Sequence, residues 1–384
     1  MKLKKSKENK QAQIFCKKFL DKKVKRYLFG TNDYAISIAK ALNNEIEGFI
    51  NDFSKDSSFF NKPIFKLKDI QKDALIVSCV VLAQAINVKE RLDSLGFNSL
   101  SYFAFYKYSG LNIKDIEFVN IAPNGFPYTI KDARDDLEQN LESYKEIYQY
   151  LSDKKSKYQF KQCLNFRLHC DIKMLQGTKY TPKEQYFEDF IGLENMDYFI
   201  DIGAFEGESS LEFIKHNQHY KSIFCFEPEN KNFLKTKENL KNYNNIQIYQ
   251  CGLGEKEQEL FITNNQSSAN KVLSQNLQNS TLAQKIDIKT LDSIILNNGG
   301  GSNINGNMLI KMDIEGYEMN ALKGMQKIIS LYNPNLAISV YHSPFDFYKI
   351  PKYILSLNKN YQLYFRDYSQ GLIESVAFFI TKNK

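Results

Sequence analysis

The amino-acid sequence predicts an α/β protein in which two parallel-sheet domains are joined by a helical connector. Short apolar runs alternate with helical stretches over residues 24–105, which is the pattern of parallel βαβ units. Residues 106–185 are charged and helix-forming, and strand–helix alternation returns over residues 186–384. A chain of 384 residues is also too long for one typical core. A basic tail at residues 1–23 completes the expected organisation.

The first domain is expected to have strands at residues 24–29, 45–51, 74–82 and 100–106, with helices between them. The connector is expected to form helices over residues 132–151 and 154–175, and Pro182 ends that helical pattern.

The second domain is expected to contain seven strands, at residues 198–202, 222–226, 246–251, 308–312, 336–341, 362–365 and 376–381. Two segments rich in Asn, Gln, Ser or Gly interrupt this alternation, at residues 264–284 and 297–307. Such tracts pack poorly, so we expect surface loops there.

The net charge of +7 is concentrated at the N-terminus, where residues 1–26 contribute +9. The remaining chain therefore carries −2, which argues against a phosphate-tracking surface and against a nucleic-acid partner. Apolar residues interleave with the basic ones in the tail. We expect a solvated, frayed terminus, and the alternative is an amphipathic helix that binds an anionic membrane or a partner protein.

The six cysteines form no CxxC pair, which favours buried free thiols in a reducing compartment. The N-terminus has no apolar signal-peptide region, and no apolar run is as long as a membrane span. The expected location is the cytoplasm.

A glycine turn follows the first strand of the second domain. Asp201 ends an apolar strand, and Gly203 and Gly207 follow before a helix begins near Ser209. Glycines let the backbone pass close to a bound nucleoside at the carboxyl end of a parallel sheet. The spacing is neither the three-glycine dinucleotide fingerprint nor a triphosphate loop.

Glu227 and Pro228 end the next strand. An acidic side chain at this position accepts hydrogen bonds from both ribose hydroxyls, and its charge disfavours a 2′-phosphate. Glu227 therefore fits an adenosine or NAD-like ribose, and the alternative is a strand-end carboxylate in solvent.

Three carboxylates and a lysine crowd into the segment from Lys311 to Glu318, where a strand gives way to a helix. A helix N-cap explains one acid of the three, Asp313, Glu315 and Glu318. Clustered carboxylates indicate binding, proton transfer or metal coordination. His342 ends the following strand and is either structural or catalytic.

These segments resemble the FkbM family of methyltransferases. The resemblance rests on Asp201-Ile-Gly203-Ala-x-x-Gly207, Phe226-Glu227-Pro228, Thr290-Leu291-Asp292, Lys311-x-Asp313-x-Glu315-Gly316-x-Glu318 and Leu322-x-Gly324, which span about half of the chain. The chain departs from the family pattern at Asp367, where related proteins commonly carry His between Arg and Tyr.

The resemblance implies a class I methyltransferase, with a doubly wound sheet, S-adenosylmethionine as the donor and an oxygen nucleophile on a sugar or polyketide. We therefore expect an O-methyltransferase that acts on a small-molecule sugar, nucleotide sugar or glycan precursor in surface-polysaccharide biosynthesis. The expected donor-binding residues are Asp201, Gly203, Ala204, Gly207, Ser209, Glu227, Pro228 and Gly252. The expected catalytic residues are His342, Asp313 and Glu315, with His342 as a neutral general base. A divalent metal is left open as a second cofactor, and no residue is assigned to it.

The first domain is similar to the small Rossmann-like domain of sialic-acid-type sugar acyltransferases, through Tyr27-Leu-Phe-Gly30, residues 46–52 and Pro63-Ile64. A nucleotide-sugar site and a degenerate docking domain both fit this likeness. Two other functions stay open for the chain. One is an NAD-linked nucleotide-sugar enzyme, which would need the missing glycine fingerprint, and the other is a non-catalytic scaffold that binds a nucleotide-linked metabolite.

Overall fold

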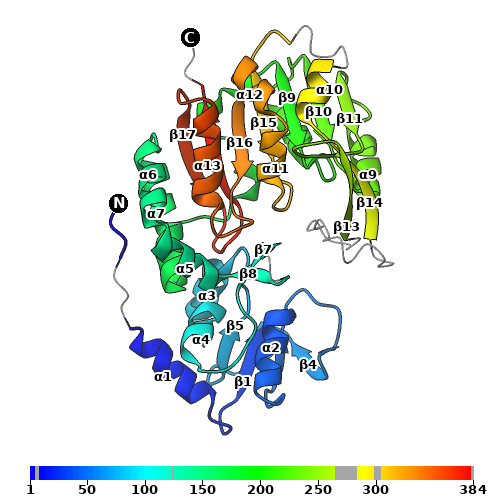
Figure 1. Ribbon diagram of the computed structural model, residues 1–384. Helices are drawn as coiled ribbons and strands as arrows, with labels where there is room; N and C mark the ends of the chain where they lie inside the picture. Colours follow the sequence, from blue (N-terminus) through cyan, green and yellow to red (C-terminus); the bar gives the residue numbers. More distant parts are fainter. Residues whose placement is uncertain (5–7, 123–124, 264–282, 298–303, 382–384) are drawn as a thin grey trace.

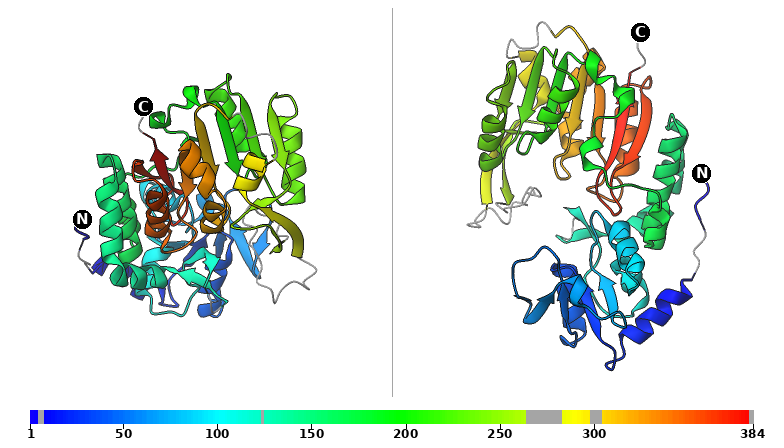
Figure 2. Two further views of the ribbon diagram at one scale, coloured as in Figure 1. Left: turned by 45° about the horizontal axis from the view of Figure 1, so that its top comes forward. Right: turned by 180° about the vertical axis from the view of Figure 1, so that it is seen from behind.

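The computed structural model describes residues 1–4, 8–122, 125–263, 283–297 and 304–381. Two α/β domains lie at opposite ends of the molecule, and the connector helices run along one side between them (Figure 1, Figure 2). In these ranges no helix is long and apolar enough to cross a membrane.

The first domain is built on a six-stranded sheet of order β3-β4-β2-β1-β5-β6. All neighbouring strands are parallel except the β3–β4 pair. This is a Rossmann-like order, and the acyltransferase likeness stays a prediction. The strands are β1 (Arg26–Phe29), β2 (Gly48–Ile50), β3 (Ser58–Phe59), β4 (Lys62–Phe65), β5 (Leu75–Ser78) and β6 (Asn98–Ser101), and the helices are α2 (Asp33–Ala41), α3 (Ala85–Ser94) and α4 (Tyr102–Tyr108).

Two expectations for this region are wrong. Residues 102–106 are helical rather than extended, because the Ser101 side chain caps α4 by accepting the Ala104 backbone N–H. The tail is not frayed, because residues 10–19 form α1 (Lys10–Phe19), whose Phe15 and Phe19 are buried. Phe19 meets Phe105 edge to face, with 5.2 Å between ring centroids. Each buried Phe contributes about 1.5–3 kcal/mol, which is enough to hold a short helix in place.

The connector is helical as expected, but the first expected helix is divided in two, the second ends at His169, and an unpredicted hairpin precedes them. The hairpin is β7 (Glu117–Ile121) and β8 (Pro127–Thr129), and the helices are α5 (Ile130–Gln139), α6 (Leu141–Tyr150) and α7 (Lys154–His169). A capping box between Thr129 and Asp132 starts α5, and Asp153 caps α7. Short 3-10 turns follow at Ile172–Leu175, Pro182–Glu184, Asp189–Ile191 and Leu193–Asn195.

The second domain contains a seven-stranded sheet of order β11-β10-β9-β15-β16-β18-β17, in which only β18 runs antiparallel to its neighbours. The strands are β9 (Tyr198–Ile202), β10 (Ser222–Phe226), β11 (Ile246–Tyr249), β15 (Met308–Met312), β16 (Asn335–Ser339), β17 (Gln362–Asp367) and β18 (Ser375–Ile380). The seven expected strands are therefore confirmed. The flanking helices are α8 (Glu208–His216), α9 (Asn230–Leu240), α10 (Leu291–Asn297), α11 (Glu318–Lys323), α12 (Gln326–Tyr332) and α13 (Asp346–Leu357).

A small three-stranded sheet lies beside this large one and was not predicted. Its strands are β12 (Gly252–Leu253), β13 (Gln258–Thr263) and β14 (Ala283–Lys289). Strands β13 and β14 flank the Asn/Gln-rich segment that the sequence assigned to a loop, and β14 includes the last two residues of that segment. Residues 264–282 of that loop, and 298–303 of the other, lie outside the described residues.

Candidate functional site

A cavity of about 870 Å³ lies at the carboxyl end of the second sheet. Strand order reverses between β9 and β15, and ligands of open α/β sheets bind beside that reversal. The volume lies within the range of small-molecule sites. Eight of the eleven residues that the sequence assigned to the donor or to catalysis line the cavity: Gly203, Ala204, Ser209, Glu227, Pro228, Gly252, Asp313 and Glu315.

The turn after β9 depends on Gly203. Its φ is +78°, and a Cβ atom there would lie 2.0 Å from the backbone oxygen of Asp313. The backbone of this turn therefore passes against the end of β15, which no larger residue would allow. Gly207 also has a positive φ, +84°, and it precedes α8 rather than lining the cavity.

Glu227 projects from the end of β10 and is 6% exposed. Its Oε2 accepts the Phe205 backbone N–H at 2.9 Å, and its Oε1 accepts the Glu229 backbone N–H at 2.9 Å. Burial raises the pKa of Glu227 to about 7 despite these two bonds, and the neighbouring Glu229 adds to the rise. Glu227 is therefore not a solvated strand-end carboxylate. Each oxygen keeps further acceptor capacity at the cavity wall.

Asp201 does not reach the cavity. Strands β9 and β15 pair Asp201 with Lys311, and Lys311 Nζ lies 3.0 Å from Asp201 Oδ1. Ser210 Oγ donates to Asp201 Oδ2 at 2.7 Å, and Lys311 Nζ donates to the Gly203 oxygen at 2.7 Å. Both charges are buried, so Asp201 acts on the site by holding the lysine that fixes the glycine turn. Breaking such a pair costs about 3–5 kcal/mol.

Asp313 and Glu315 follow β15 and line the opposite wall of the cavity, with side chains 22% and 23% exposed. Two tyrosine hydroxyls donate to Asp313 Oδ2, from Tyr186 at 2.7 Å and from Tyr341 at 3.1 Å. Burial raises the pKa of Glu315 to about 7, although His342 acts to lower it.

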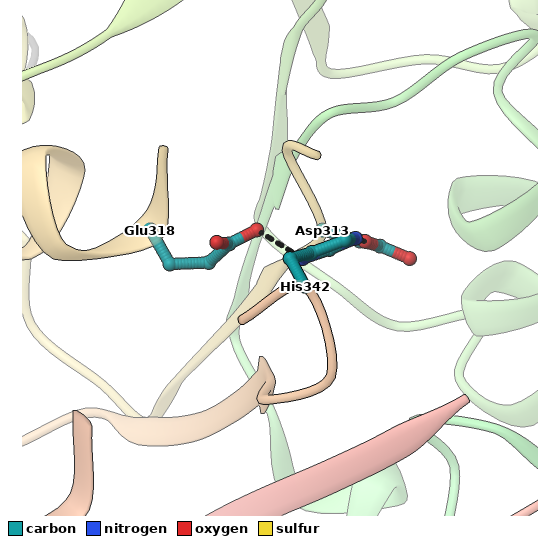
Figure 3. A group of neighbouring side chains, drawn as sticks. All are labelled: Asp313, Glu318 and His342. Carbon is teal, nitrogen blue, oxygen red and sulfur yellow. Dashed lines mark ion pairs between the residues drawn. The ribbon is translucent and has the colours of Figure 1, made fainter. Parts of the chain in front are cut away.

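His342 lies behind these carboxylates and is completely buried, so it does not line the cavity. Its ring lies between Glu318, 3.0 Å from Nδ1, and Asp313, 3.3 Å from Nε2 (Figure 3). Glu315 Oε2 lies 3.5 Å from Nε2. Burial alone would lower the pKa of His342, but the three carboxylates outweigh it and raise the pKa to about 10. The three carboxylates therefore favour the protonated ring, whereas the sequence predicted a neutral base.

Glu318 fixes the turn that presents the two cavity carboxylates. It is 2% exposed, and its Oε1 accepts the backbone N–H groups of Ile314 at 3.0 Å and of Gly316 at 3.3 Å. Burial acts to raise the pKa of Glu318, but the charge of His342 outweighs it and the pKa is lowered.

Several residues of the site were missed in the sequence. Tyr186, Phe205 and Glu374 line the cavity, and each has a positive φ, as Glu315 does. A positive φ in a non-glycine residue costs about 1–3 kcal/mol of conformational free energy, and such residues cluster at active sites and ligand-binding sites. Tyr186 lies directly after the connector and Glu374 in the loop before β18, and the sequence assigned neither of them to the site.

The N-terminal half also contributes to this region. Leu82 and Val119 line the cavity, so the first domain supplies part of one wall. Asn120 donates from its backbone N–H to the His342 oxygen at 3.0 Å, and from its side chain to the Gly316 oxygen at 3.2 Å. The hairpin that the sequence did not predict thus contacts both the turn that carries the carboxylates and the segment that carries His342.

The strand order of the second sheet, with its reversal beside the cavity and β18 antiparallel, is that of a class I methyltransferase fold. A family model described as the methyltransferase FkbM domain matches residues 201–363. Residues 201–363 are therefore an FkbM methyltransferase domain, and the resemblance drawn from the motifs is confirmed for this part of the chain.

Two known proteins are similar to this chain. A methyltransferase FkbM from Methylobacillus flagellatus KT superposes with a TM-score of 0.69 at 21% identity, covering 97% of this chain and 93% of that one, which extends the similarity in fold to both domains. Methyltransferase 1 of Beauveria bassiana is 26% identical over 148 residues. That match covers 33% of this chain and 58% of the fungal protein, so the chain spans little more than half of that relative's length.

Proposed function

We propose that the protein transfers a methyl group from S-adenosylmethionine to a hydroxyl of a sugar or glycan precursor. One observation carries this proposal: Glu227 at the end of β10 shares a single cavity with Asp313 and Glu315 at the end of β15. One wall suits the ribose of a nucleoside donor, and the other suits a hydroxyl that must lose its proton.

The donor lies along the β9–β10 wall in this proposal. Glu227 accepts the ribose hydroxyls, while the backbone of residues 203–205 follows the nucleoside closely because Gly203 has no side chain. Ala204, Ser209, Pro228 and Gly252 shape the same wall. The methionine end then points toward β15, where the carboxylates of Asp313 and Glu315 face a sulfonium of opposite charge.

The chemical step is an in-line displacement. The C–S bond of the donor breaks while a C–O bond forms, S-adenosylhomocysteine leaves, and the hydroxyl proton passes to a carboxylate at the cavity wall. Asp313 is already oriented by the hydroxyls of Tyr186 and Tyr341, so it holds the acceptor oxygen in a fixed position. His342 acts from behind as a positioning residue, because it does not reach the cavity.

A sugar fits the acceptor side because carboxylates and tyrosines predominate there. Carboxylate oxygens accept hydrogen bonds from several hydroxyls at once, and Glu374 adds a third carboxylate to this side. We place the reaction in surface-polysaccharide biosynthesis. A cytoplasmic location agrees with six free, buried cysteines, which are typical of a reducing compartment.

The test is methyl transfer to a defined panel. The full chain is incubated with S-adenosylmethionine labelled in its methyl group and with nucleotide sugars and free sugars, and products are identified by mass spectrometry. The proposal expects a labelled methyl ether on a sugar carbon together with equimolar S-adenosylhomocysteine. Label on a nitrogen or carbon atom, or on a non-sugar acceptor in a broader panel, would overturn the acceptor assignment.

A further inference from the structure

We infer that Asp313, Glu315 and His342 bind a divalent metal ion at the floor of the cavity, where it would hold the acceptor oxygen. This inference deepens the proposed function and rests on it for the role of the ion. The binding of the ion rests on the geometry of the three side chains alone.

His342 is the first observation. Its side chain is completely buried, and its Nε2 has no hydrogen-bond partner among the described residues. Buried polar nitrogens without partners are rare because they cost free energy. Here Nε2 faces the oxygens of Asp313 and Glu315, which is the arrangement of ligands around an ion.

The separations fit first-row metal coordination. Two ligand atoms about 2.1 Å from one metal ion lie roughly 3.0–3.4 Å apart, depending on the coordination geometry. His342 Nε2 lies 3.3 Å from Asp313 Oδ1 and 3.5 Å from Glu315 Oε2. These two separations place the Asp313 and Glu315 oxygens beside the same ring nitrogen, and one ligand atom each of Asp313, Glu318 and His342 lie within 4.8 Å of one another.

The outer partners are also in place. A metal-bound histidine usually directs its other ring nitrogen to a carboxylate, and Glu318 lies 3.0 Å from Nδ1 on the side opposite Asp313 (Figure 3). Tyr186 donates to Asp313 Oδ2, and the Tyr341 hydroxyl lies 3.1 Å from Oδ2 and 3.3 Å from Oδ1, which fixes the carboxylate with Oδ1 3.3 Å from His342 Nε2. Glu318 is thus an outer residue, and Glu315 completes the set of ligands.

Charge supports a cation at this position. Asp313, Glu315, Glu318 and Glu374 lie around a single histidine, while the nearby Lys311 is engaged by Asp201. One imidazole and two carboxylates suit Zn²⁺, Mn²⁺, Fe²⁺ or Co²⁺. Because Asp313 and Glu315 also line the cavity, the remaining coordination positions would face the acceptor, and the ion would polarise its hydroxyl.

The test measures metal binding by the full chain without turnover. Protein stripped with a chelator is titrated with Zn²⁺, Mn²⁺ and Co²⁺ by calorimetry, and visible spectra are recorded for Co²⁺. We expect one ion per chain, and d–d bands for Co²⁺ that show nitrogen and oxygen ligands. His342→Gln, which keeps a side chain of similar size, should weaken binding by at least about tenfold.

The control is Asp287→Asn, an exposed carboxylate on β14, which should leave metal affinity unchanged. Glu315→Gln is a second ligand variant in case His342→Gln fails to fold, as judged by circular dichroism. Absence of binding by folded wild-type protein, or equal affinity in a folded ligand variant, would overturn the site. Donor titration of the same samples tests the proposed function separately, because Glu227 is not among the ligands.

Discussion

The two sheets of this molecule share the order of their five parallel strands, β4-β2-β1-β5-β6 and β11-β10-β9-β15-β16, but differ at their carboxyl edges. In the first sheet, the polar side chain in the turn after β1 forms its hydrogen bonds within the domain. Asn32 Nδ2 donates to the Cys79 oxygen at 3.0 Å, and Asn32 Oδ1 accepts the Ala35 N–H at 3.1 Å. At the equivalent edge of the second sheet, Glu227, Asp313 and Glu315 face a cavity. The same topology therefore supports one sheet edge whose polar side chain is hydrogen-bonded within the domain and one sheet edge whose carboxylates face a cavity.

The difference lies in what each turn does with its polar groups. Asn32 caps α2 and donates a hydrogen bond to Cys79, which directly follows β5. Its hydrogen-bonding groups therefore stabilise the fold and do not face a ligand site. The second edge instead keeps carboxylates partly free and accepts strained backbone at Glu315. Function therefore follows from side chains placed on the fold and not from strand order, which is the general rule for such architectures.

The largest expected effect follows from Asp313→Asn. The amide keeps the shape of the side chain but removes the charge that holds the acceptor oxygen and takes part in proton transfer. We expect turnover to fall by about 10²- to 10⁴-fold, with a much smaller loss of donor affinity because Glu315 still faces the sulfonium. Steady-state kinetics and calorimetry measure the two quantities, with Asp287→Asn as the control. Near-normal turnover would remove Asp313 from the chemistry.

Glu227→Ala should act on donor binding instead. Losing charged hydrogen bonds to the ribose costs about 2–3 kcal/mol, or roughly 30- to 150-fold in the dissociation constant for S-adenosylmethionine. The matched control is Glu146→Ala, an exposed carboxylate on α6 that pairs with Lys352 at the surface. A dissociation constant that Glu227→Ala leaves unchanged would place the donor elsewhere.

Donor affinity should also depend on pH through Glu227. Burial raises its pKa to about 7, with Glu229 adding to the rise and Lys311 opposing it. The ionised form accepts the ribose hydroxyls, so the association constant should fall as pH falls through 7, by about tenfold between pH 8 and pH 6. Calorimetry at several pH values measures this, and Glu227→Gln should flatten the dependence. A dependence that Glu227→Gln retains would assign it to another group.

The smallest effect is expected in the first sheet. Asn32→Ala removes a helix cap and should lower stability by about 0.5–2 kcal/mol. Donor affinity should stay within about twofold, because Asn32 does not line the cavity. Thermal unfolding and donor titration of the same sample separate the two outcomes. A large loss of donor affinity in folded protein would show that the first sheet binds the donor.

The sequence predicted correctly those strands and site residues that depend on a single local segment. Strands β9 and β15 were legible as buried apolar runs, and Glu227 and Asp313 were identified as site residues because each directly follows such a run. Residues 102–106 were misassigned because an aromatic run fits either a strand or a buried helix, and the cap at Ser101 decides between them.

Other features depend on contacts between distant segments. Tyr186 and Glu374 reach the cavity from loops far in sequence from the carboxylate cluster, and the Asn120 side chain donates to the Gly316 oxygen across 196 residues of sequence. Asp201 was assigned to the donor because it precedes the glycine turn, but the pairing of β9 with β15 places Lys311 beside it and commits its charge to the interior. His342 was read as neutral because the sequence does not show three carboxylates gathering around it.

A crystal structure of the full chain with S-adenosylhomocysteine tests the central claim most directly, since it shows which sheet edge binds the donor. We predict that the ribose hydroxyls lie within hydrogen-bonding distance of Glu227, with the adenosine against the turn of residues 203–205 and the sulfur directed toward Asp313. Nucleoside density at the Gly30 turn of the first sheet, or in the cavity but away from Glu227, would contradict the assignment of the second sheet edge as the donor site.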